Sequence, residues 1–345
     1  LMDKPDIFSI ENGRHFHSRP FVELCEKYGI HYICEESCVD LLGNPVKINF
    51  DNCRTHTVVQ QAREILNYWD DSPLSEEEKI NIGKIFFERK IKSIKTNDKV
   101  YTANQKLGVL PDCWDASKTN IVIFNSSEDE FAAIGGDFDK NKLFKNQNEG
   151  IEALLSFVNG NDIHFYLRIH PNLNGIKYKY HTSLYEIEKK YTNLTIIPPN
   201  SKVSSYSLLE VCDKVIVFNS TMGVEACYWG KSVMALYPSS YSELGVCFIP
   251  HGKEEIRSFL RGEVELSLNR QNAIKFGFWT LNDKRKTVDN SLCDLKKFSI
   301  NFFGRRKMVY SMNYNCSDRK LKILMYMYLF AVALGKIFIE KQEER

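Results

Sequence analysis

The stretch KVIVFNSTMGVEACYWGKSVMALY, residues 214–237, decides the fold of this chain. It reads as an apolar strand, a small polar turn at Ser220-Thr221, a helix that opens at Gly223, and a second apolar strand. Two hydroxyls and several backbone N–H groups are therefore expected at the start of a helix. Such a start suits a phosphate, because these N–H groups have no partner within the helix.

The same alternation of strands and helices extends outward from this stretch. Apolar strands are predicted at 119–125, 163–169 and 194–197, and helices at 150–158, 183–191 and 206–211. Apolar strands that alternate with crossover helices predict an α/β fold with a parallel, doubly wound sheet. Ligands of such sheets bind at the carboxyl ends of the strands.

Polar motifs follow three of these strands. They are NSSEDE at 125–130, RIHPN at 168–172 and NST at 219–221. Because the carboxyl ends of parallel strands lie on one edge of the sheet, the three loops are predicted to form a single site. The sequence contains no GxGxxG, GxSxG or HExxH motif.

The two ends of the chain have looser patterns. Residues 1–118, with a strand near Phe8, a helix at 19–28 and helices within 57–95, predict a smaller or incomplete α/β domain that faces a Rossmann-like domain at 119–265. Residues 266–345 are predicted to form a C-terminal helical segment. The chain begins at Leu1 and soon enters a strand, which suggests a part of a longer protein.

Composition indicates a globular protein that does not bind nucleic acid. The 345 residues include 46 Lys+Arg and 44 Asp+Glu, a net charge of only +2. The ten cysteines are scattered through apolar segments and are interpreted mostly as reduced core residues. Because no basic and apolar leader is present, a cytoplasmic location is expected.

The most apolar stretch is 321–339, in which Lys322 and Lys336 leave an uninterrupted run of 13 residues. This run is shorter than the roughly 20 residues that span a bilayer. A buried terminal helix is the preferred interpretation. An interfacial membrane helix and a true span are the alternatives.

The motifs together resemble those of bacterial capsule and surface-polysaccharide glycosyltransferases of the GT-B type, especially enzymes that use CMP-activated Kdo or sialic acid. In these families a His-Pro motif and a Ser/Thr motif bind the nucleotide phosphate, and an acidic residue at the domain cleft performs the chemistry. The resemblance covers roughly 119–260, with Asn12-Gly13-Arg14 similar to a motif of the N-terminal domain. It implies a GT-B-like fold in which 1–118 is the acceptor side.

The resemblance also implies roles for individual residues. The donor nucleotide and its phosphate would contact His170, Pro171, Ser220, Thr221, Gly223 and Glu225, with Glu225 on the ribose. Asp129 would be the primary carboxylate, assisted by Glu128 or Glu130. It would act as a nucleophile if stereochemistry is retained and as a general base if it is inverted.

A sugar acid also needs a partner for its own carboxylate, and the bidentate geometry of a guanidinium suits that group. Arg14 and Arg168 are the candidates. The chemistry requires no metal and no cofactor, because the CMP-sugar is itself the donor substrate. The expected acceptor is an oligosaccharide or lipid-linked glycan of the bacterial surface, such as capsule, lipopolysaccharide or O-antigen. Peripheral association with the inner face of the cytoplasmic membrane would accompany it.

Each role has a structural alternative. The acidic loop could cap a helix through Phe131-Ala132-Ala133, and His170 could be structural. Ser220-Thr221 could be only an N-cap, Arg14 could form an ion pair, and Glu225 could be an exposed helical carboxylate. Two other functions also remain open: a UDP-sugar 2-epimerase, and a non-catalytic nucleotide- or glycan-binding module of a longer polymerase.

Overall fold

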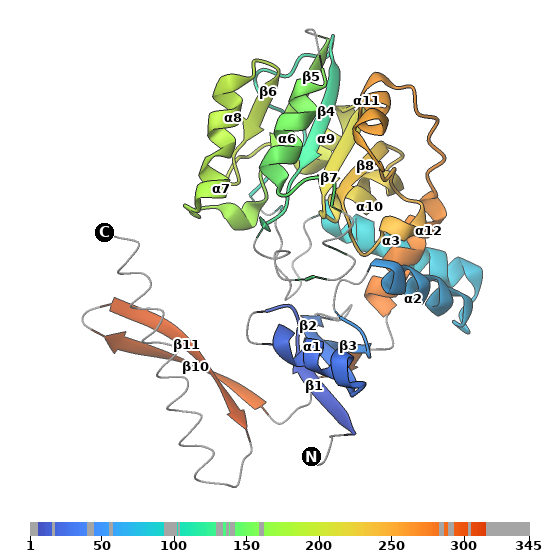
Figure 1. Ribbon diagram of the computed structural model, residues 1–345, viewed down its shortest axis with the longest axis vertical. Helices are drawn as coiled ribbons and strands as arrows, with labels where there is room; N and C mark the ends of the chain where they lie inside the picture. Colours follow the sequence, from blue (N-terminus) through green and yellow to red (C-terminus); the bar gives the residue numbers. More distant parts are fainter. Residues whose placement is uncertain are drawn as a thin grey trace. The chain divides into compact units, whose positions relative to one another are not determined.

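The computed structural model divides the chain into two compact units, Leu1–Thr287 and Val288–Arg345. The predicted boundaries after 118 and 265 both fall inside the first unit. Elements are labelled in Figure 1. The structure describes residues 6–15, 18–39, 45–54, 58–92, 102, 104–128, 134–135, 138, 142–158, 162–282, 286–288, 293–302 and 305–314.

The centre of the first unit is a parallel sheet of five strands in the order β6-β5-β4-β7-β8 (Figure 1). The strands are β4 Thr119–Phe124, β5 Ile163–Arg168, β6 Leu194–Ile197, β7 Lys214–Phe218 and β8 Ser232–Tyr237. The predicted Rossmann-like sheet is thereby confirmed. Each strand lies within a residue or two of its predicted position.

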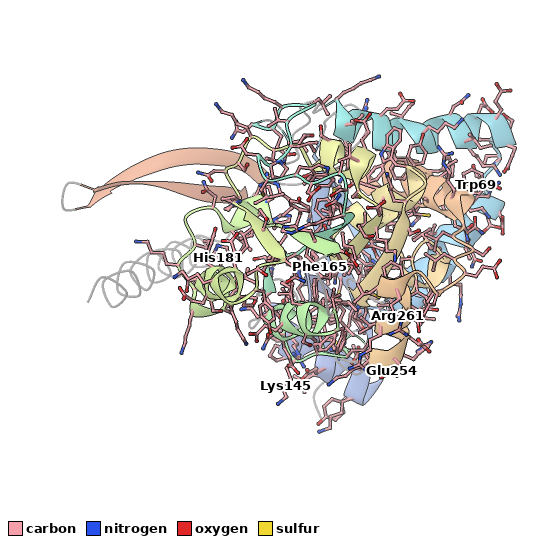
Figure 2. The ribbon with its side chains drawn as sticks, turned by 90° about the horizontal axis from the view of Figure 1, so that it is seen from above. Trp69, Lys145, Phe165, His181, Glu254 and Arg261 are labelled. Atoms are coloured by element: carbon pink, nitrogen blue, oxygen red, sulfur yellow. The ribbon has the colours of Figure 1, made fainter. Side chains whose placement is uncertain are left out.

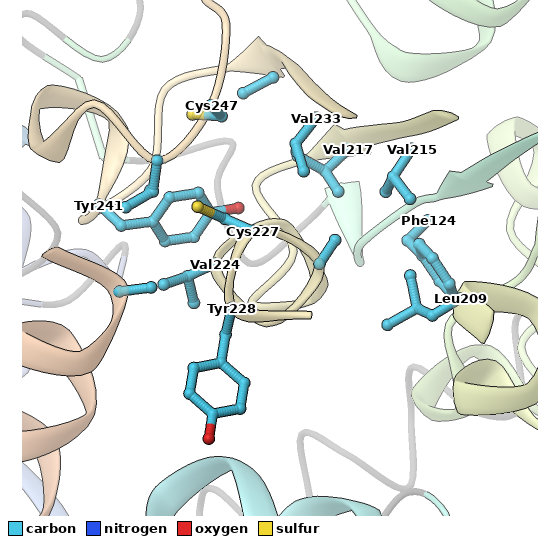
Figure 3. Close-up of a cluster of buried hydrophobic side chains, with 14 of the residues drawn as sticks. Phe124, Leu209, Val215, Val217, Val224, Cys227, Tyr228, Val233, Tyr241 and Cys247 are labelled. Carbon is cyan, nitrogen blue, oxygen red and sulfur yellow. The ribbon is translucent and has the colours of Figure 1, made fainter. Parts of the chain in front are cut away.

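Helices cover both faces of this sheet, which explains why its strands are apolar on both sides. Ile121 and Ile123 of β4 belong to one hydrophobic cluster, whereas Val122 and Phe124 belong to another, as expected for side chains that alternate between faces. Figure 3 shows part of the second cluster around Phe124. The helices are α6 Gln147–Ser156, α7 Lys179–Thr182, α8 Leu184–Lys190, α9 Ser205–Val211, α10 Met222–Tyr228 and α11 Lys253–Arg261.

Three further helices, α2 Val58–Asp70, α3 Glu76–Ile91 and α12 Arg270–Asn282, pack together beside α10. Ser75 and Glu78 form a capping box at the start of α3, inside the region 57–95 in which the sequence predicts helices. Trp69 of α2, labelled in Figure 2, meets Phe278 of α12 edge to face at 5.3 Å. Phe87 of α3 stacks on Tyr228 of α10 at 4.0 Å. The helices from residues 58–91 therefore share a core with the Rossmann-like sheet.

Two glycines allow α3 and α12 to approach closely. A Cβ at Gly83 would lie less than 3.0 Å from the carbonyl oxygen of Ile274, and a Cβ at Gly277 would clash in the same way with the carbonyl oxygen of Gly83. Because the obstacles are backbone atoms, a side chain at either position would push the two helices apart.

The N-terminal part forms a second, smaller sheet in the order β1-β2-β3-β9. Its strands are β1 Ile7–Glu11, β2 His31–Val39, β3 Pro45–Asp51 and β9 Lys286–Val288, and α1 Arg19–Tyr28 connects β1 to β2. β1 and β2 are parallel, but β2 and β3 are antiparallel. The reduced α/β character of this part is as predicted. Cys25, Cys34 and Cys53 are buried in its core, in agreement with the prediction that most cysteines are core residues.

Within the predicted helical segment 266–345, α12 is a helix, but residues 293–302 and 305–314 are strands. β10 Cys293–Phe302 and β11 Arg305–Tyr314 form an antiparallel pair. The signal missed in the sequence is the alternation of Phe298, Ile300 and Phe302 with polar residues, which has the period of a strand. Among the described residues no helix is long and apolar enough to cross a membrane. The stretch 321–339 lies outside the described residues.

Gly83→Ala is expected to lower the free energy of unfolding by about 1–3 kcal/mol, the usual effect of overpacking, despite a gain of about 1 kcal/mol in helix propensity. Urea denaturation followed by far-UV circular dichroism measures this change. Lys84→Ala, at the exposed neighbouring position, is the control and should stay within about 0.5 kcal/mol of the parent. Equal stabilities of the two variants would show that α3 and α12 are not in close contact at Gly83.

Candidate active site

The strand order places a topological switch point between β4 and β7. β5 and β6 lie on one side of β4, whereas β7 and β8 lie on the other side. The strands are all parallel, but the side of β4 on which successive strands are added changes, and this change makes the switch point. Open α/β sheets bind their ligands at this switch point. The loops that flank it here are 125–128 after β4 and 219–221 after β7.

Two buried polar residues after β4 join the three predicted loops. Asn125 Oδ1 accepts a hydrogen bond of 2.8 Å from the backbone N–H of His170, and Ser126 Oγ donates one of 2.5 Å to the carbonyl oxygen of Phe218. Asn125 and Ser126 are only 4% and 5% exposed. The ends of β4, β5 and β7 are therefore held together as the sequence predicts. Asn125 and Ser126 were not among the predicted site residues, although two polar residues directly after a buried strand were a usable signal.

His170 has a defined orientation at the end of β5. Its Nδ1 accepts a hydrogen bond of 3.2 Å from the backbone N–H of Asn172. A neutral imidazole whose Nδ1 is an acceptor carries its proton on Nε2, so the other side of the ring is a donor. Pro171 begins the short 3-10 helix Pro171–Leu173, where the fixed φ of proline favours the turn.

The turn between β7 and α10 is sharp. Asn219 adopts a left-handed conformation with φ of 54°, which asparagine tolerates better than most residues. The Ser220 hydroxyl lies near the start of α10 and accepts a long hydrogen bond of 3.4 Å from the backbone N–H of Met222. A hydroxyl that accepts this bond still has a proton to donate. Thr221 is exposed, whereas Ser220 is buried.

Gly223 makes room for Tyr241. A Cβ at Gly223 would lie less than 3.0 Å from the Tyr241 hydroxyl oxygen and 3.0 Å from Val217 Cγ2. That hydroxyl donates a hydrogen bond to the carbonyl oxygen of Ser220 and so holds the turn (Figure 3 shows the Tyr241 ring beside α10). The structure thus gives Gly223 a packing role. The predicted contact of Gly223 with phosphate remains a prediction.

Glu225 is not the exposed carboxylate that one alternative expected, since it is 1% exposed. Its Oε2 accepts a hydrogen bond of 2.6 Å from the Tyr206 hydroxyl, and its Oε1 accepts one of 3.1 Å from the Thr221 hydroxyl. Lys90 Nζ lies 3.4 Å from the same Oε1. Glu225 therefore organises the turn from within the protein, and its predicted contact with a ribose remains a prediction.

The two predicted arginines have structural partners. Arg168 is 2% exposed and donates to the carbonyl oxygens of Pro198 and Ser201, in the loop after β6. Burial of the Arg168 guanidinium lowers its pKa to about 10. Arg14 pairs with Glu36 at 3.5 Å, so the ion-pair alternative is confirmed. Binding of a sugar carboxylate by either arginine remains a prediction, and the contacts of Arg168 do not favour it.

The acidic loop is described only as far as Glu128. Glu128 Oε2 accepts a hydrogen bond of 3.1 Å from the backbone N–H of Gln147, the first residue of α6, and its Oε1 accepts one of 3.4 Å from the Tyr237 hydroxyl. A carboxylate at a helix start is stabilised by the positive end of the helix dipole. Glu128 therefore lies at the start of α6, a different helix from the one at 131–133 that the capping alternative named, and residues 131–133 lie outside the described residues. Asp129 and Glu130 lie outside the described residues.

Comparison with known proteins agrees with this geometry. Residues 97–256 match the family described as "Capsule polysaccharide biosynthesis protein", a range that contains β4 to β8 and all three loops. This match confirms the predicted resemblance to proteins of capsule polysaccharide biosynthesis. A search of curated proteins finds no match.

Among solved structures, the chain is similar to KpsC, beta Kdo 2,4 transferase, of Thermosulfurimonas dismutans. The TM-score is 0.50 at 14% identity, and the match covers 87% of this chain and 84% of that chain. The beta Kdo 2,7 transferase of the same KpsC matches with a TM-score of 0.41 at 14% identity, over 87% of this chain and 95% of that chain. The UDP-GlcNAc 2-epimerase of Methanocaldococcus jannaschii matches with a TM-score of 0.33 at 12% identity, over 93% and 76%. At such identities the first likeness supports the GT-B-like fold.

Gly223→Ala is expected to lower the free energy of unfolding by about 1–3 kcal/mol, because the new Cβ must displace Tyr241. The double variant Gly223→Ala/Tyr241→Phe lacks the hydroxyl oxygen nearest to that Cβ. Its loss in the free energy of unfolding should therefore be smaller than the sum of the losses in the two single variants. Denaturation curves of all four proteins measure the coupling. Strictly additive effects would contradict the proposed contact.

Proposed function

We propose that this chain is a glycosyltransferase that moves Kdo, or a related nonulosonic acid, from its CMP-activated form to a bacterial surface glycan. The observation that carries the proposal is a pair of hydrogen bonds, one accepted by Asn125 and one donated by Ser126, which hold the loops after β4, β5 and β7 together at one edge, or rim, of the sheet. The match of residues 97–256 to capsule polysaccharide biosynthesis proteins supports a surface-glycan substrate.

The residues on this rim suit the departure of a nucleotide phosphate. Breaking the bond between the sugar C2 and CMP develops negative charge on the phosphate oxygens. The Nε2–H of His170 and the hydroxyl of Ser220 are donors that could stabilise this charge, as oxyanion donors do. Donors of this kind require neither a metal nor another cofactor, and the proposal includes none.

The acidic loop supplies the second half of the chemistry in this proposal. Because Glu128 already accepts hydrogen bonds from Gln147 and Tyr237, we assign the primary carboxylate to Asp129, with Glu130 assisting. Asp129 would attack the sugar if stereochemistry is retained, or deprotonate the acceptor hydroxyl if it is inverted. We further propose an oligosaccharide or lipid-linked glycan acceptor, and a cytoplasmic reaction at the inner face of the membrane.

Thermal-shift measurements with CMP, UMP, UDP and GDP test the donor assignment, because a ligand that binds the folded protein raises its apparent stability. CMP is expected to raise the melting temperature most. A response to UDP alone would overturn the CMP assignment and favour the 2-epimerase alternative, whose activity needs no acceptor.

His170→Ala is expected to weaken CMP binding about 10-fold or more, since one donor to a charged phosphate is lost. Isothermal titration calorimetry measures the dissociation constant. His251→Ala, which removes an exposed histidine before α11, is the matched control and should bind CMP like the parent. If both variants bind CMP equally, His170 does not contact the nucleotide.

Asp129→Asn is expected to abolish transfer while CMP still binds, because the substitution removes the carboxylate but not the phosphate donors. CMP release from CMP-Kdo, in the presence of a Kdo-terminated oligosaccharide, measures turnover. Asp162→Asn, at an exposed position before β5, should leave turnover unchanged. Normal turnover by Asp129→Asn would remove the acidic loop from the mechanism and favour a different catalytic group.

A further inference from the structure

A lysine from a distant part of the sequence reaches the turn between β7 and α10. Lys90 lies in the last turn of α3, and its Nζ is 3.5 Å from Thr221 Oγ1 and 3.4 Å from Glu225 Oε1. The ammonium also lies over the ring of Phe86, 5.0 Å from its centroid. These contacts fix the position of its charge beside the loop after β7.

The negative charge of Glu225 requires a cation at this turn if a phosphate is to bind there. Glu225 is a buried carboxylate close to the proposed phosphate position, and without compensation it would repel an incoming phosphate. Its two other partners, the hydroxyls of Tyr206 and Thr221, are neutral. Among the described residues, Lys90 is the cation in contact with Glu225, so it offsets this negative charge.

The hydroxyls of Ser220 and Thr221 differ in whether they can donate a hydrogen bond to a ligand. Thr221 has one hydroxyl proton, and it points to Glu225 Oε1. Ser220 accepts from Met222 and keeps its own proton for a ligand. Lys90 has three N–H donors, of which Thr221 and Glu225 use two. The third is available to an anion, and the Lys90 side chain is 38% exposed, so an anion can reach it.

We propose that Lys90 binds the phosphate of the nucleotide donor, together with the Ser220 hydroxyl, while Thr221 and Glu225 hold the Lys90 ammonium in place. This inference rests on the proposed function, because it uses the same phosphate position. It adds a charged ligand from α3, a helix outside the Rossmann-like sheet. The phosphate group, rather than the base or the sugar, is what Lys90 recognises.

Calorimetric titration of CMP and of cytidine, which lacks the phosphate, tests this role. Lys90→Gln is expected to weaken CMP binding roughly 10- to 100-fold, the usual effect of losing a hydrogen bond to a charged group, and to leave cytidine binding unchanged. Lys90→Arg keeps the charge and should retain most of the CMP affinity. Lys92→Gln removes the same charge at the C-cap of α3, where Lys92 pairs with Glu88, and should bind CMP like the parent.

A double variant guards against a folding defect. Lys90→Gln/Glu225→Gln removes both charges, so no buried carboxylate loses its cation. This variant should fold, bind CMP more weakly than the parent and bind cytidine like the parent. The affinity of the parent for CMP should also fall more steeply with salt than that of Lys90→Gln.

The outcomes separate this inference from the proposed function. If the parent binds CMP and Lys90→Gln binds it equally well, the role of Lys90 is overturned and the proposed function stands. If the parent binds UDP instead of CMP, the donor assignment fails, and the same comparison with UDP and uridine decides the role of Lys90. Equal losses of CMP and cytidine affinity would show a purely structural role, and binding of no nucleotide by the parent would overturn both proposals.

Discussion

The site depends on the two hydrogen bonds made by the residues that follow β4. Asn125 holds the backbone of His170, and Ser126 holds the backbone of Phe218, so the central strand sets the spacing of its two neighbours. Both side chains are buried, and a buried hydrogen bond that loses one partner leaves a costly unsatisfied group. The loops therefore have little freedom to separate. A rim held in this way can present donors to a phosphate without rearrangement.

A second constraint comes from helices outside the sheet. The glycines at 83 and 277 bring α3 and α12 close together, and Phe87 stacks on Tyr228 of α10. This packing positions the end of α3 beside the start of α10, and Lys90 thereby reaches Glu225. The charge environment of the turn is thus controlled by a segment more than a hundred residues earlier in the chain.

Several predicted site residues have partners within the protein. Arg168 and Glu225 are polar residues near strand ends, and sequence reasoning assigns such residues to ligands. In the structure Arg168 binds carbonyl oxygens after β6, and Glu225 accepts hydrogen bonds from Tyr206 and Thr221. Glu128 caps α6. Most hydrogen bonds of side chains are to backbone groups or water, and the sequence does not show which partner a given side chain has.

The sequence by itself determined the order of strands and helices between 119 and 237. The spacing of apolar residues and the residue types of turns, on which that order depends, are local properties of the chain. The same local pattern predicted that the NSSEDE, RIHPN and NST motifs would share one edge. Only the tertiary structure decided that Asn125 and Ser126 join these loops, that Gly223 accommodates Tyr241, and that Lys90 stands at the turn. Each of these contacts joins residues far apart in the chain, and such pairings depend on packing in three dimensions rather than on the neighbouring residues.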